Sequence, residues 1–363
     1  MEKSFHYTSI NGFKGIIEDK NIRMTRSEFL NDPYDCQLFT ELVDKYLTEN
    51  KKEVVDECLK NHNSSVSYLY NNNCDLVSFI KYMQNNVRLY VMSLTEAEDA
   101  MNMWNCYGYS GVQLELSLKE LEQKLKNNLT IDEEYIFSSK VIYTNLNAKL
   151  NEIKIPTFLD FKLLRKNSDN VFVENKNSLD KNSSHFNSKL YDTNNLEGFI
   201  NTYLDSYILC IKHLIKNKVI SENMSNEVVL QHIFNNLSNL NKDMLWKKDL
   251  NLYMLVLLSL IKSDTYKHEN EYRIVYFENN ISQKKQKGEK YGIKNIDSKQ
   301  FLYPYITFGY KNNFISSITL SPLTNNLSIN KEIYKNTIKS FMLSNGFEDE
   351  PIKVEYSKHK IRW

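Results

Sequence analysis

Hydrophobic and polar residues follow two different spacings near the N-terminus of the chain. Residues 5–8 and 22–25 are short segments in which apolar side chains alternate with polar ones, as they do in strands. Between them, Ile10, Phe13 and Ile17 recur every three or four residues, which places them on one side of a helix. The chain is therefore predicted to begin with a strand, a helix and a second strand.

The rest of the chain contains further segments of both kinds. Strands are predicted at residues 89–94, 111–116, 140–144, 271–277, 314–320 and 352–356. Helices are predicted at residues 37–61, 64–86, 117–127 and 330–345, with a short one between residues 96 and 107. Ser117 followed by Glu120 matches the capping box that begins many helices. The lysine-rich residues 283–294 show neither spacing and are predicted to form an exposed loop.

A polar stretch and three helical segments interrupt this series of strands and helices. Residues 166–195 are rich in Asn, Ser, Asp and Lys and contain few large apolar groups with which to form a core. Helices are then predicted at residues 196–218, 221–240 and 242–262. The last of these is apolar on almost all sides, as a helix at the centre of a bundle would be.

We therefore predict an α+β protein in which a large helical subdomain is inserted between two halves of one core. Its 363 residues would suffice for two domains at ~150 residues per domain. The predicted parts are residues 1–144, the first half of the α/β core with its helical segment 37–86; residues 145–195, a polar linker or insertion; residues 196–266, the helical subdomain; and residues 267–363, the second half of the core.

The charge balance argues against a function that depends on overall charge. The chain has 46 Lys plus Arg and 45 Asp plus Glu, for a formal net charge of +1. A protein that binds a polyanion or a membrane surface through its overall charge would be strongly basic. Because lysine is the common cation in this chain, each of the few arginines is a better marker of a site that needs planar, bidentate geometry.

Several features favour a cytoplasmic protein without a membrane anchor. Residues 1–9 lack the apolar stretch of a secretory signal. The longest apolar run, residues 252–261, is about half of the ~20 residues that cross a bilayer. The 5 cysteines are scattered, with no Cys-x-x-Cys pair and no histidine at zinc-ligand spacing, so no bound metal is predicted.

The signatures of several common enzyme classes are missing from the sequence. It has no Gly-x-Gly-x-x-Gly fingerprint, no P-loop, no His-Glu-x-x-His motif and no nucleophile elbow. Rossmann dehydrogenases, P-loop NTPases, zincins and ordinary serine hydrolases are therefore disfavoured.

The segment from Glu269 to Arg273 carries the strongest candidate chemistry. At the two-residue period of a strand, Glu269, Glu271 and Arg273 project from one face. One interpretation is ion pairing on a solvent-exposed face. The other is a carboxylate that lies beside a charged reaction centre and is oriented by a neighbouring Arg.

Other polar and aromatic residues allow both a structural and a functional interpretation. His6 lies in the first strand beside Tyr7 and Thr8, where a hydrogen-bonded structural histidine is the commoner case. Trp104 and Tyr107 suit a core, although either ring could also stack on a base or a nicotinamide.

The order of these motifs along the chain resembles that of a family, the bacterial domain of unknown function 2971. The matching residues are His6, Tyr7, Thr8 and Ser9 in an opening strand; Phe29, Asn31, Asp32 and Pro33 in a turn; Ser93 to Thr95 at a strand end; Met103, Trp104 and Tyr107; Gly111 and Val112; Glu269, Glu271 and Arg273; and an ending from Ser321 to Arg362. The residue before Tyr107 is often His in that family and is Cys106 here.

A second resemblance, to ADP-ribosyltransferases, suggests a reaction. Those enzymes combine a His on the first strand, a Ser or Thr on a central strand and a Glu-x-Glu strand late in the chain. The resemblance implies a split sheet, mixed or antiparallel, with NAD in the cleft between its two parts. Departure of nicotinamide leaves an oxocarbenium-like ribose, which a nearby carboxylate stabilises as carboxylates do in glycoside hydrolysis.

This second resemblance implies a set of site residues. The expected catalytic residues are Glu271, Glu269 and His6. The expected NAD-binding residues are His6, Tyr7, Thr8, Arg23, Asn31, Asp32, Ser93, Thr95, Trp104, Tyr107 and Arg273.

The resemblance also implies what some of these residues do. Glu271 would hold the ribose 2′-hydroxyl and stabilise the cation, while Glu269 would steer the acceptor. His6 and Thr8 would hold the adenosine-side ribose. A ring would stack on Tyr107 or Trp104, and the pyrophosphate would contact Arg23 or Arg273. Ser93 to Thr95 reads Ser-Leu-Thr rather than the Ser-Thr-Ser of the arginine-specific branch, so subtype and acceptor stay open.

We therefore expect a NAD-consuming, ADP-ribosyltransferase-like enzyme, or a NAD glycohydrolase, that acts on a protein or a nucleic acid. By association, such an enzyme could be a toxin or an anti-phage abortive-infection effector. One alternative is a non-enzymatic sensor or interaction module of a defence system, whose helices 196–262 bind a regulatory protein. A second is a nuclease in which Glu269, Glu271 and Asp32 hold a divalent metal.

Overall fold

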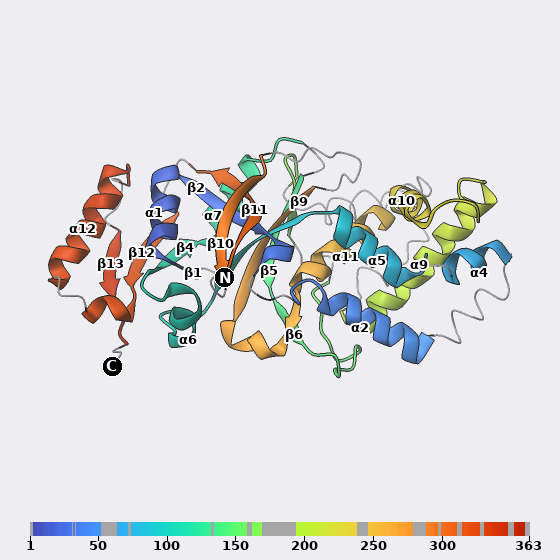
Figure 1. The fold of residues 1–363 in the computed structure, drawn as a ribbon, viewed down its shortest axis with the longest axis horizontal. Helices are drawn as coiled ribbons and strands as arrows, with labels where there is room; N and C mark the ends of the chain where they lie inside the picture. Colours follow the sequence, from blue (N-terminus) through green and yellow to red (C-terminus); the bar gives the residue numbers. More distant parts are fainter. Residues whose placement is uncertain are drawn as a thin grey trace.

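A mixed sheet of eleven strands forms the centre of the computed structural model (Figure 1). Its strands are β1 (Lys3–Thr8), β2 (Asn21–Arg26), β3 (Leu89–Thr95), β4 (Val112–Ser117), β5 (Glu134–Lys140), β7 (Leu163–Leu164), β9 (Glu271–Glu278), β10 (Lys290–Ile296), β11 (Lys299–Gly309), β12 (Ile315–Leu320) and β13 (Lys353–Tyr356). A separate parallel pair consists of β6 (Ile142–Thr144) and β8 (Ile261–Ser263). The structure describes residues 3–30, 32, 34–51, 64–71, 74–131, 134–157, 162–168, 194–237, 246–278, 288–296, 299–310, 314–326, 330–347 and 352–359.

The sheet divides at β3, because the two edges of this strand are paired differently. The strand order is β10-β11-β2-β3-β1-β4-β12-β13, and a branch of β9, β5 and β7 leaves from β3. One edge of β3 pairs with β9 along its whole length. The other edge pairs with β2 at Val91 and with β1 at Thr95, and Ser93 lies between the two contacts. The strands β1 and β2 therefore separate from each other over the middle of β3.

Each face of the sheet has its own hydrophobic core, which explains the nearly continuous apolar run of β9. Val275 and Phe277 belong to the core that contains the helical layer. Ile274 and Tyr276 belong to the core on the opposite face. A strand that is buried on both faces needs apolar side chains at successive positions rather than at alternate ones.

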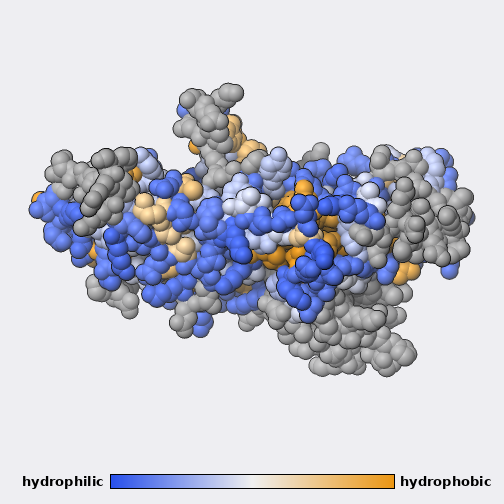
Figure 2. All heavy atoms as spheres, turned by 90° about the horizontal axis from the view of Figure 1, so that it is seen from below, coloured by the Kyte–Doolittle hydropathy of each residue, from blue (hydrophilic) through white to orange (hydrophobic). Residues whose placement is uncertain are grey.

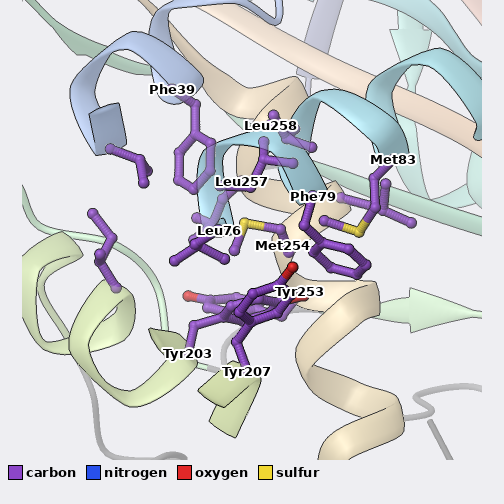
Figure 3. Packing of buried hydrophobic residues seen from close by; sticks show 14 of the residues in the cluster. Phe39, Leu76, Phe79, Met83, Tyr203, Tyr207, Tyr253, Met254, Leu257 and Leu258 are labelled. Atoms are coloured by element: carbon purple, nitrogen blue, oxygen red, sulfur yellow. The ribbon is translucent and has the colours of Figure 1, made fainter. Parts of the chain in front are cut away.

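The helical layer is built from two separate segments of the chain. Its helices are α2 (Leu38–Tyr46), α4 (Ser64–Asn71), α5 (Leu76–Asn86), α9 (Leu196–Lys216), α10 (Asn226–Leu237) and α11 (Trp246–Leu260). Phe39, Phe79, Tyr203 and Leu257 come from four of these helices and meet in one core (Figure 3). The segment 37–86, predicted as part of the first half of the α/β core, thus packs with the predicted helical subdomain.

The opposite core is covered by α1 (Ile10–Asp19), α7 (Leu118–Asn127) and α12 (Lys331–Ser344). Ser9 begins α1, because its hydroxyl accepts a hydrogen bond of 3.1 Å from the Gly12 N–H. In Figure 1, α1 and α12 lie at the end of the molecule away from the helical layer. On the face drawn in Figure 2, hydrophilic residues predominate and hydrophobic ones gather in a limited area near the middle.

The predicted strands and helices mostly correspond to observed ones, and the sheet is mixed, as expected. The nearly all-apolar character of the last predicted helix is confirmed, since residues 252–258 of α11 are all buried. The predicted helix over residues 64–86 is two helices, α4 and α5. The short helix predicted between residues 96 and 107 is α6 (Met101–Met103), followed by a π-helical turn at Trp104–Gly108.

Three predictions about local structure are wrong. Ser117 makes no side-chain capping bond, because it still pairs in the sheet opposite Lys3. Residues 290–294 form part of β10 instead of an exposed loop, and β5 and β11 were not predicted. Glu269 is not on a strand: it ends a 3-10 helix (Asp264–Glu269), and Asn270 has a φ of 44° before β9 begins.

Some predictions concern residues outside the described ranges. Most of the predicted polar linker, residues 169–193, belongs to this group, as do Asn31 and Pro33 of the predicted turn. Lys154, within the predicted linker, and Asn195, at its end, form an isolated β-bridge. That bridge attaches the start of α9 to residues 145–157.

Candidate active site

Two adjoining cavities meet where β1 and β2 separate. The first has a volume of about 280 Å³ and is lined by residues of β1, β3 and β9, by Lys262 of β8 and by Asp32 and Asp35. The second has a volume of about 730 Å³ and lies over β2, β11 and the first turns of α1. Both are lined by His6, Arg23, Thr25 and Met92, so the two cavities adjoin at the split in the sheet, and together they are called the groove.

Glu271 is the centre of a hydrogen-bonded cluster in the first cavity. The Ser93 hydroxyl donates to its Oε1 over 2.5 Å, and Arg273 Nε donates to the same oxygen over 2.8 Å. Its Oε2 accepts from Lys262 Nζ over 3.0 Å and from Arg273 Nη2 over 3.1 Å. The backbone N–H of Glu271 donates to the Tyr143 hydroxyl over 2.8 Å. Both carboxylate oxygens are therefore engaged.

Arg273 connects Glu271 to the helical layer. Its guanidinium donates to both oxygens of Asp35, over 2.6 and 2.5 Å, and to the main-chain oxygen of Ser259 at the end of α11 over 2.7 Å. Arg273 is completely buried. Such a bidentate, charge-assisted pair fixes the orientation of both partners.

Lys262 bridges Glu271 and Glu269. Its ammonium lies 2.8 Å from Glu269 Oε2 and 3.0 Å from Glu271 Oε2. The second oxygen of Glu269 accepts a hydrogen bond of 2.6 Å from the Tyr107 hydroxyl. Although Glu269 is not on the strand, the turn at Asn270 thus brings it to the same cluster as Glu271.

The charges in this cluster set its protonation states. Burial alone would raise the pKa of Glu271, but Arg273 and Lys262 outweigh burial and hold that pKa at about 2. Burial would lower the pKa of Lys262, yet Glu271 and Glu269 raise it above its ordinary value. Both groups are therefore charged at neutral pH.

The first cavity carries a net negative charge. Four carboxylates line it, from Asp32, Asp35, Glu269 and Glu271, against three cations, Lys262 and Arg273 inside the cluster and Arg23 at its edge, which leaves a formal charge of −1. An environment of this kind attracts a cationic group and stabilises positive charge that develops next to it.

His6 lies in the split itself. Its Nδ1 is 3.1 Å from the main-chain oxygen of Ser93, which lies in the part of β3 that pairs with neither β1 nor β2. Burial lowers the pKa of His6 below its ordinary value, although the contact with Ser93 acts in the opposite direction. At neutral pH the imidazole is therefore uncharged, and its Nδ1–H donates to the Ser93 carbonyl.

Arg23 lies where the two cavities join. Its side chain is exposed, donates to the Tyr303 hydroxyl over 3.0 Å and stacks over the Tyr305 ring at 4.2 Å. Within the described ranges no carboxylate forms an ion pair with it. Its positive charge is therefore available to an anionic group in the groove.

Three of the predicted NAD-binding residues, Trp104, Tyr7 and Thr95, have hydrogen-bond partners within the protein, and Tyr7 and Thr95 also line the first cavity. Trp104 is buried, its indole N–H donates to Asp99 over 2.8 Å, and it lines neither cavity. The Tyr7 hydroxyl contacts Ala97, Ala100 and Gln113. Its ring packs edge-on against Trp104 at 4.9 Å. In this conformation the Trp104 ring is therefore not accessible from either cavity.

Thr95 also has a structural role, because its hydroxyl donates to the main-chain oxygen of Glu269 over 2.6 Å and accepts from the Ala97 N–H over 2.9 Å. Tyr107 lines the first cavity and bonds Glu269, and Thr8 lines the second cavity. Asp32 accepts from the Tyr34 N–H over 2.9 Å, as an Asx turn does. Asn31 lies outside the described residues.

The sequence did not single out Asp35, Ser259 or Lys262. Lys262 had a detectable signal, because it directly follows the apolar run of residues 252–261, where a charge needs a buried partner. Asp35 had no such signal in the sequence, because its partner Arg273 is far away along the chain.

Comparisons with known proteins agree with one of the two resemblances. The model of the family described as "Protein of unknown function (DUF2971)" matches residues 103–274, just under half of the chain. This match supports the resemblance to that family. No curated protein and no solved structure matches the chain. The comparisons thus give no support to the resemblance to ADP-ribosyltransferases.

Two further observations concern metals and membranes. In the described part of the chain, no group of three His, Cys, Asp or Glu side chains is placed to hold a metal ion. Among the helices that the structure describes, none combines the length and the apolar character that crossing a bilayer requires.

Proposed function

We propose that the chain consumes NAD, either by transferring ADP-ribose to a macromolecule or by hydrolysing NAD. The observation that carries this proposal is the charge distribution along the groove. A negative cavity around Glu271 lies at one end, and Arg23, which forms no ion pair with the residues that the structure describes, lies at the junction with the second cavity. NAD has the complementary order of charges, with a cationic nicotinamide ring on one side of an anionic pyrophosphate.

The dimensions of the groove are also suitable for a dinucleotide. Ligand sites have volumes of about 300–1,000 Å³. The first cavity, at about 280 Å³, suits one ring and its ribose, and the second, at about 730 Å³, suits a nucleoside with its phosphate. In this pose the pyrophosphate contacts Arg23, and His6 and Thr8 lie beside the adenosine-side ribose.

The cluster around Glu271 suits the bond that breaks in such a reaction. The C–N bond between ribose and nicotinamide breaks, its electron pair leaves with the neutral nicotinamide, and positive charge develops on the ribose. Glu271, ionised because its pKa is about 2, stabilises that charge. An acceptor group or water then bonds to the ribose carbon and loses a proton to solvent or to a base.

Glu271 must exchange one hydrogen bond in order to bind the ribose. Of its donors, Arg273 and Lys262 are buried, whereas Ser93 is an exposed residue of β3. The Ser93 hydroxyl is therefore the donor that a ribose 2′-hydroxyl can replace. Glu269, held by Lys262 and Tyr107, would orient the acceptor. Consumption of NAD would suit the role of a toxin or an abortive-infection effector.

The metal-dependent nuclease is the less favoured alternative. A divalent cation needs free carboxylate oxygens, and all four oxygens of Glu269 and Glu271 already accept hydrogen bonds. Lys262 also lies between the two carboxylates, where a metal would have to be.

The test is release of nicotinamide from NAD, measured by chromatography with candidate acceptors present. The wild type should release nicotinamide, Glu271→Gln should lose at least 100-fold in rate by the magnitude typical of such electrostatic groups, and His6→Ala should be impaired. Glu332→Gln, an exposed carboxylate on α12, is the matched control and should retain wild-type activity. If the wild type neither binds nor cleaves NAD, the proposal fails.

A further inference from the structure

The four carboxylates that line the first cavity differ in how their oxygens are used. Three of them, Asp35, Glu269 and Glu271, accept hydrogen bonds at both oxygens, and at least one donor to each is a buried cation. The fourth, Asp32, forms no ion pair with any residue that the structure describes. It is therefore the carboxylate of this cavity that remains available to a ligand.

Asp32 presents one carboxylate oxygen to the cavity. The residue is only 6% exposed, and its Oδ1 accepts a hydrogen bond of 2.9 Å from the Tyr34 N–H, which fixes the orientation of the side chain. Its Oδ2 has no hydrogen-bond donor among the described residues, and protein atoms do not enclose this oxygen fully. A buried carboxylate oxygen that lacks a donor is unfavourable, so a ligand that supplies an N–H group would bind favourably there.

Asp32 shares a small space with Glu271. The ammonium of Lys262, which bonds Glu271, lies 4.6 Å from the centre of the Tyr266 ring. Burial raises the pKa of Tyr266 above its ordinary value, and the negative charge of Asp32 raises it further, so these two residues are also neighbours. All four residues line a cavity of about 280 Å³. A ring whose ribose is bound at Glu271 therefore comes within reach of Asp32.

The chemistry of nicotinamide matches what Asp32 lacks. In the pose proposed above, the nicotinamide ring occupies the first cavity. The ring is cationic, which suits the net negative charge of that cavity. Its one substituent with N–H donors is the carboxamide. The carboxamide NH₂ can therefore supply the donor that Asp32 Oδ2 does not find in the protein.

We propose that Asp32 accepts a hydrogen bond from the nicotinamide carboxamide and makes the site specific for NAD over nicotinic acid adenine dinucleotide. This inference rests on the proposed consumption of NAD. In the second dinucleotide a carboxylate replaces the carboxamide, so the group has no N–H to donate and carries a negative charge. It would face the Asp32 carboxylate in a cavity that is already negative, and like charges placed against each other strongly disfavour binding.

Comparison of the two dinucleotides on the wild type is the first test. Release of nicotinamide and of nicotinic acid is measured by chromatography. The kcat/KM should be at least about 100-fold higher for NAD, because a site built to accept a hydrogen bond rejects an analogue that cannot donate it. Equal values would overturn the role of Asp32 and leave the proposed function intact. If the wild type consumes neither dinucleotide, the proposed function fails and this inference fails with it.

Asp32→Asn reverses the hydrogen-bonding character of this position. The amide oxygen can still accept from the Tyr34 N–H, so the NH₂ group takes the place of Oδ2 and becomes a donor. The preference for NAD should therefore fall to about 10-fold or less, mainly because kcat/KM for the nicotinic acid dinucleotide rises. A purely structural defect would lower both values together. An unchanged ratio of the two values would thus contradict the proposal.

Asp19→Asn is the matched control. Asp19 is an exposed carboxylate that lines the second cavity and not the first. The substitution should leave the ratio of the two kcat/KM values unchanged. A ratio that changes in Asp19→Asn but not in Asp32→Asn would place the nicotinamide in the second cavity and overturn the assignment to Asp32.

Discussion

The two cavities of the groove differ in how their charged groups are satisfied. In the first, Glu271, Arg273, Asp35 and Lys262 are buried and bonded to one another. In the second, Arg23 is exposed, and its partners among the described residues are Tyr303 and Tyr305. A buried network is held in one geometry, whereas an exposed cation can turn toward a ligand. The first cavity therefore has the character of a fixed reaction centre and the second that of a binding region.

This difference predicts that removing a charge mainly affects stability in the first cavity and mainly affects ligand binding in the second. Removal of a charge from the first cavity should reduce the free energy of unfolding, because a buried partner is left uncompensated. Removal of Arg23 should leave stability unchanged and weaken ligand binding. The following predictions begin with the largest effect.

Arg273→Met should produce the largest loss of stability. It leaves Asp35 and Glu271 as buried carboxylates without their main cation, which typically costs about 3–5 kcal/mol. The measurement is urea denaturation followed by circular dichroism. Arg88→Met, a partly exposed arginine paired with Glu289, serves as the control and should lose less than about 1 kcal/mol. Equal losses in the two variants would show that the buried cluster does not contribute as described.

The pH dependence of stability should contain a contribution from Glu271. Burial raises its pKa, but Arg273 and Lys262 lower it to about 2 from an ordinary value of 4.5. Since the pKa is lower in the folded state, the stabilisation is present above pH 4.5 and is lost as the pH falls toward 2. Its size is on the order of 3 kcal/mol. Urea denaturation of Glu271→Gln should show a shallower decline in stability over this pH range than the wild type shows.

Lys262→Met tests the bridge between the two glutamates. Without the ammonium, Glu269 and Glu271 lie close together as buried like charges, so the pKa of Glu271 should rise and the variant should be destabilised by about 2 kcal/mol at neutral pH. The destabilisation should decrease in acid, where a glutamate takes up a proton. Lys262→Arg should retain most of the stability. A variant whose deficit is the same at pH 4 and pH 7 is inconsistent with this electrostatic explanation.

Arg23→Gln should change stability least and binding most. Its side chain is exposed and without an ion-pair partner among the described residues, so the free energy of unfolding should change by less than about 0.5 kcal/mol. Loss of a charge-assisted bond to a phosphate should weaken NAD binding about 10-fold, and calorimetry can measure this. Arg23→Lys should restore part of the affinity. Unchanged affinity would show that the pyrophosphate does not bind at Arg23.

Much of the fold could be predicted from local spacing. The first strand and helix, and the apolar runs of β3 and β9, are each specified by residues close together in the sequence. β11 was missed because Pro304 interrupts its alternation, and β10 because its lysines resemble those of a loop. In both cases pairing in the sheet overrides the local preference.

Part of the candidate site could be predicted from the sequence, since the predicted residues His6, Ser93 and Tyr107 all line the first cavity. Glu269, Glu271 and Arg273 could be found together, and the first cavity contains all three. Their actual arrangement depends on the αL turn at Asn270 and on Asp35 and Lys262, which approach from other parts of the chain. For Trp104 the sequence could not distinguish a core residue from a binding residue, because aromatic residues of both kinds look alike in sequence.

A crystal structure of Glu271→Gln soaked with NAD tests the central claim most directly. The substitution slows turnover while leaving the shape of the groove nearly unchanged. The account predicts density for NAD across the split in the sheet, with the pyrophosphate at Arg23 and the nicotinamide ribose beside residue 271. An empty groove at saturating NAD, or NAD bound with its nicotinamide away from residue 271, would contradict it.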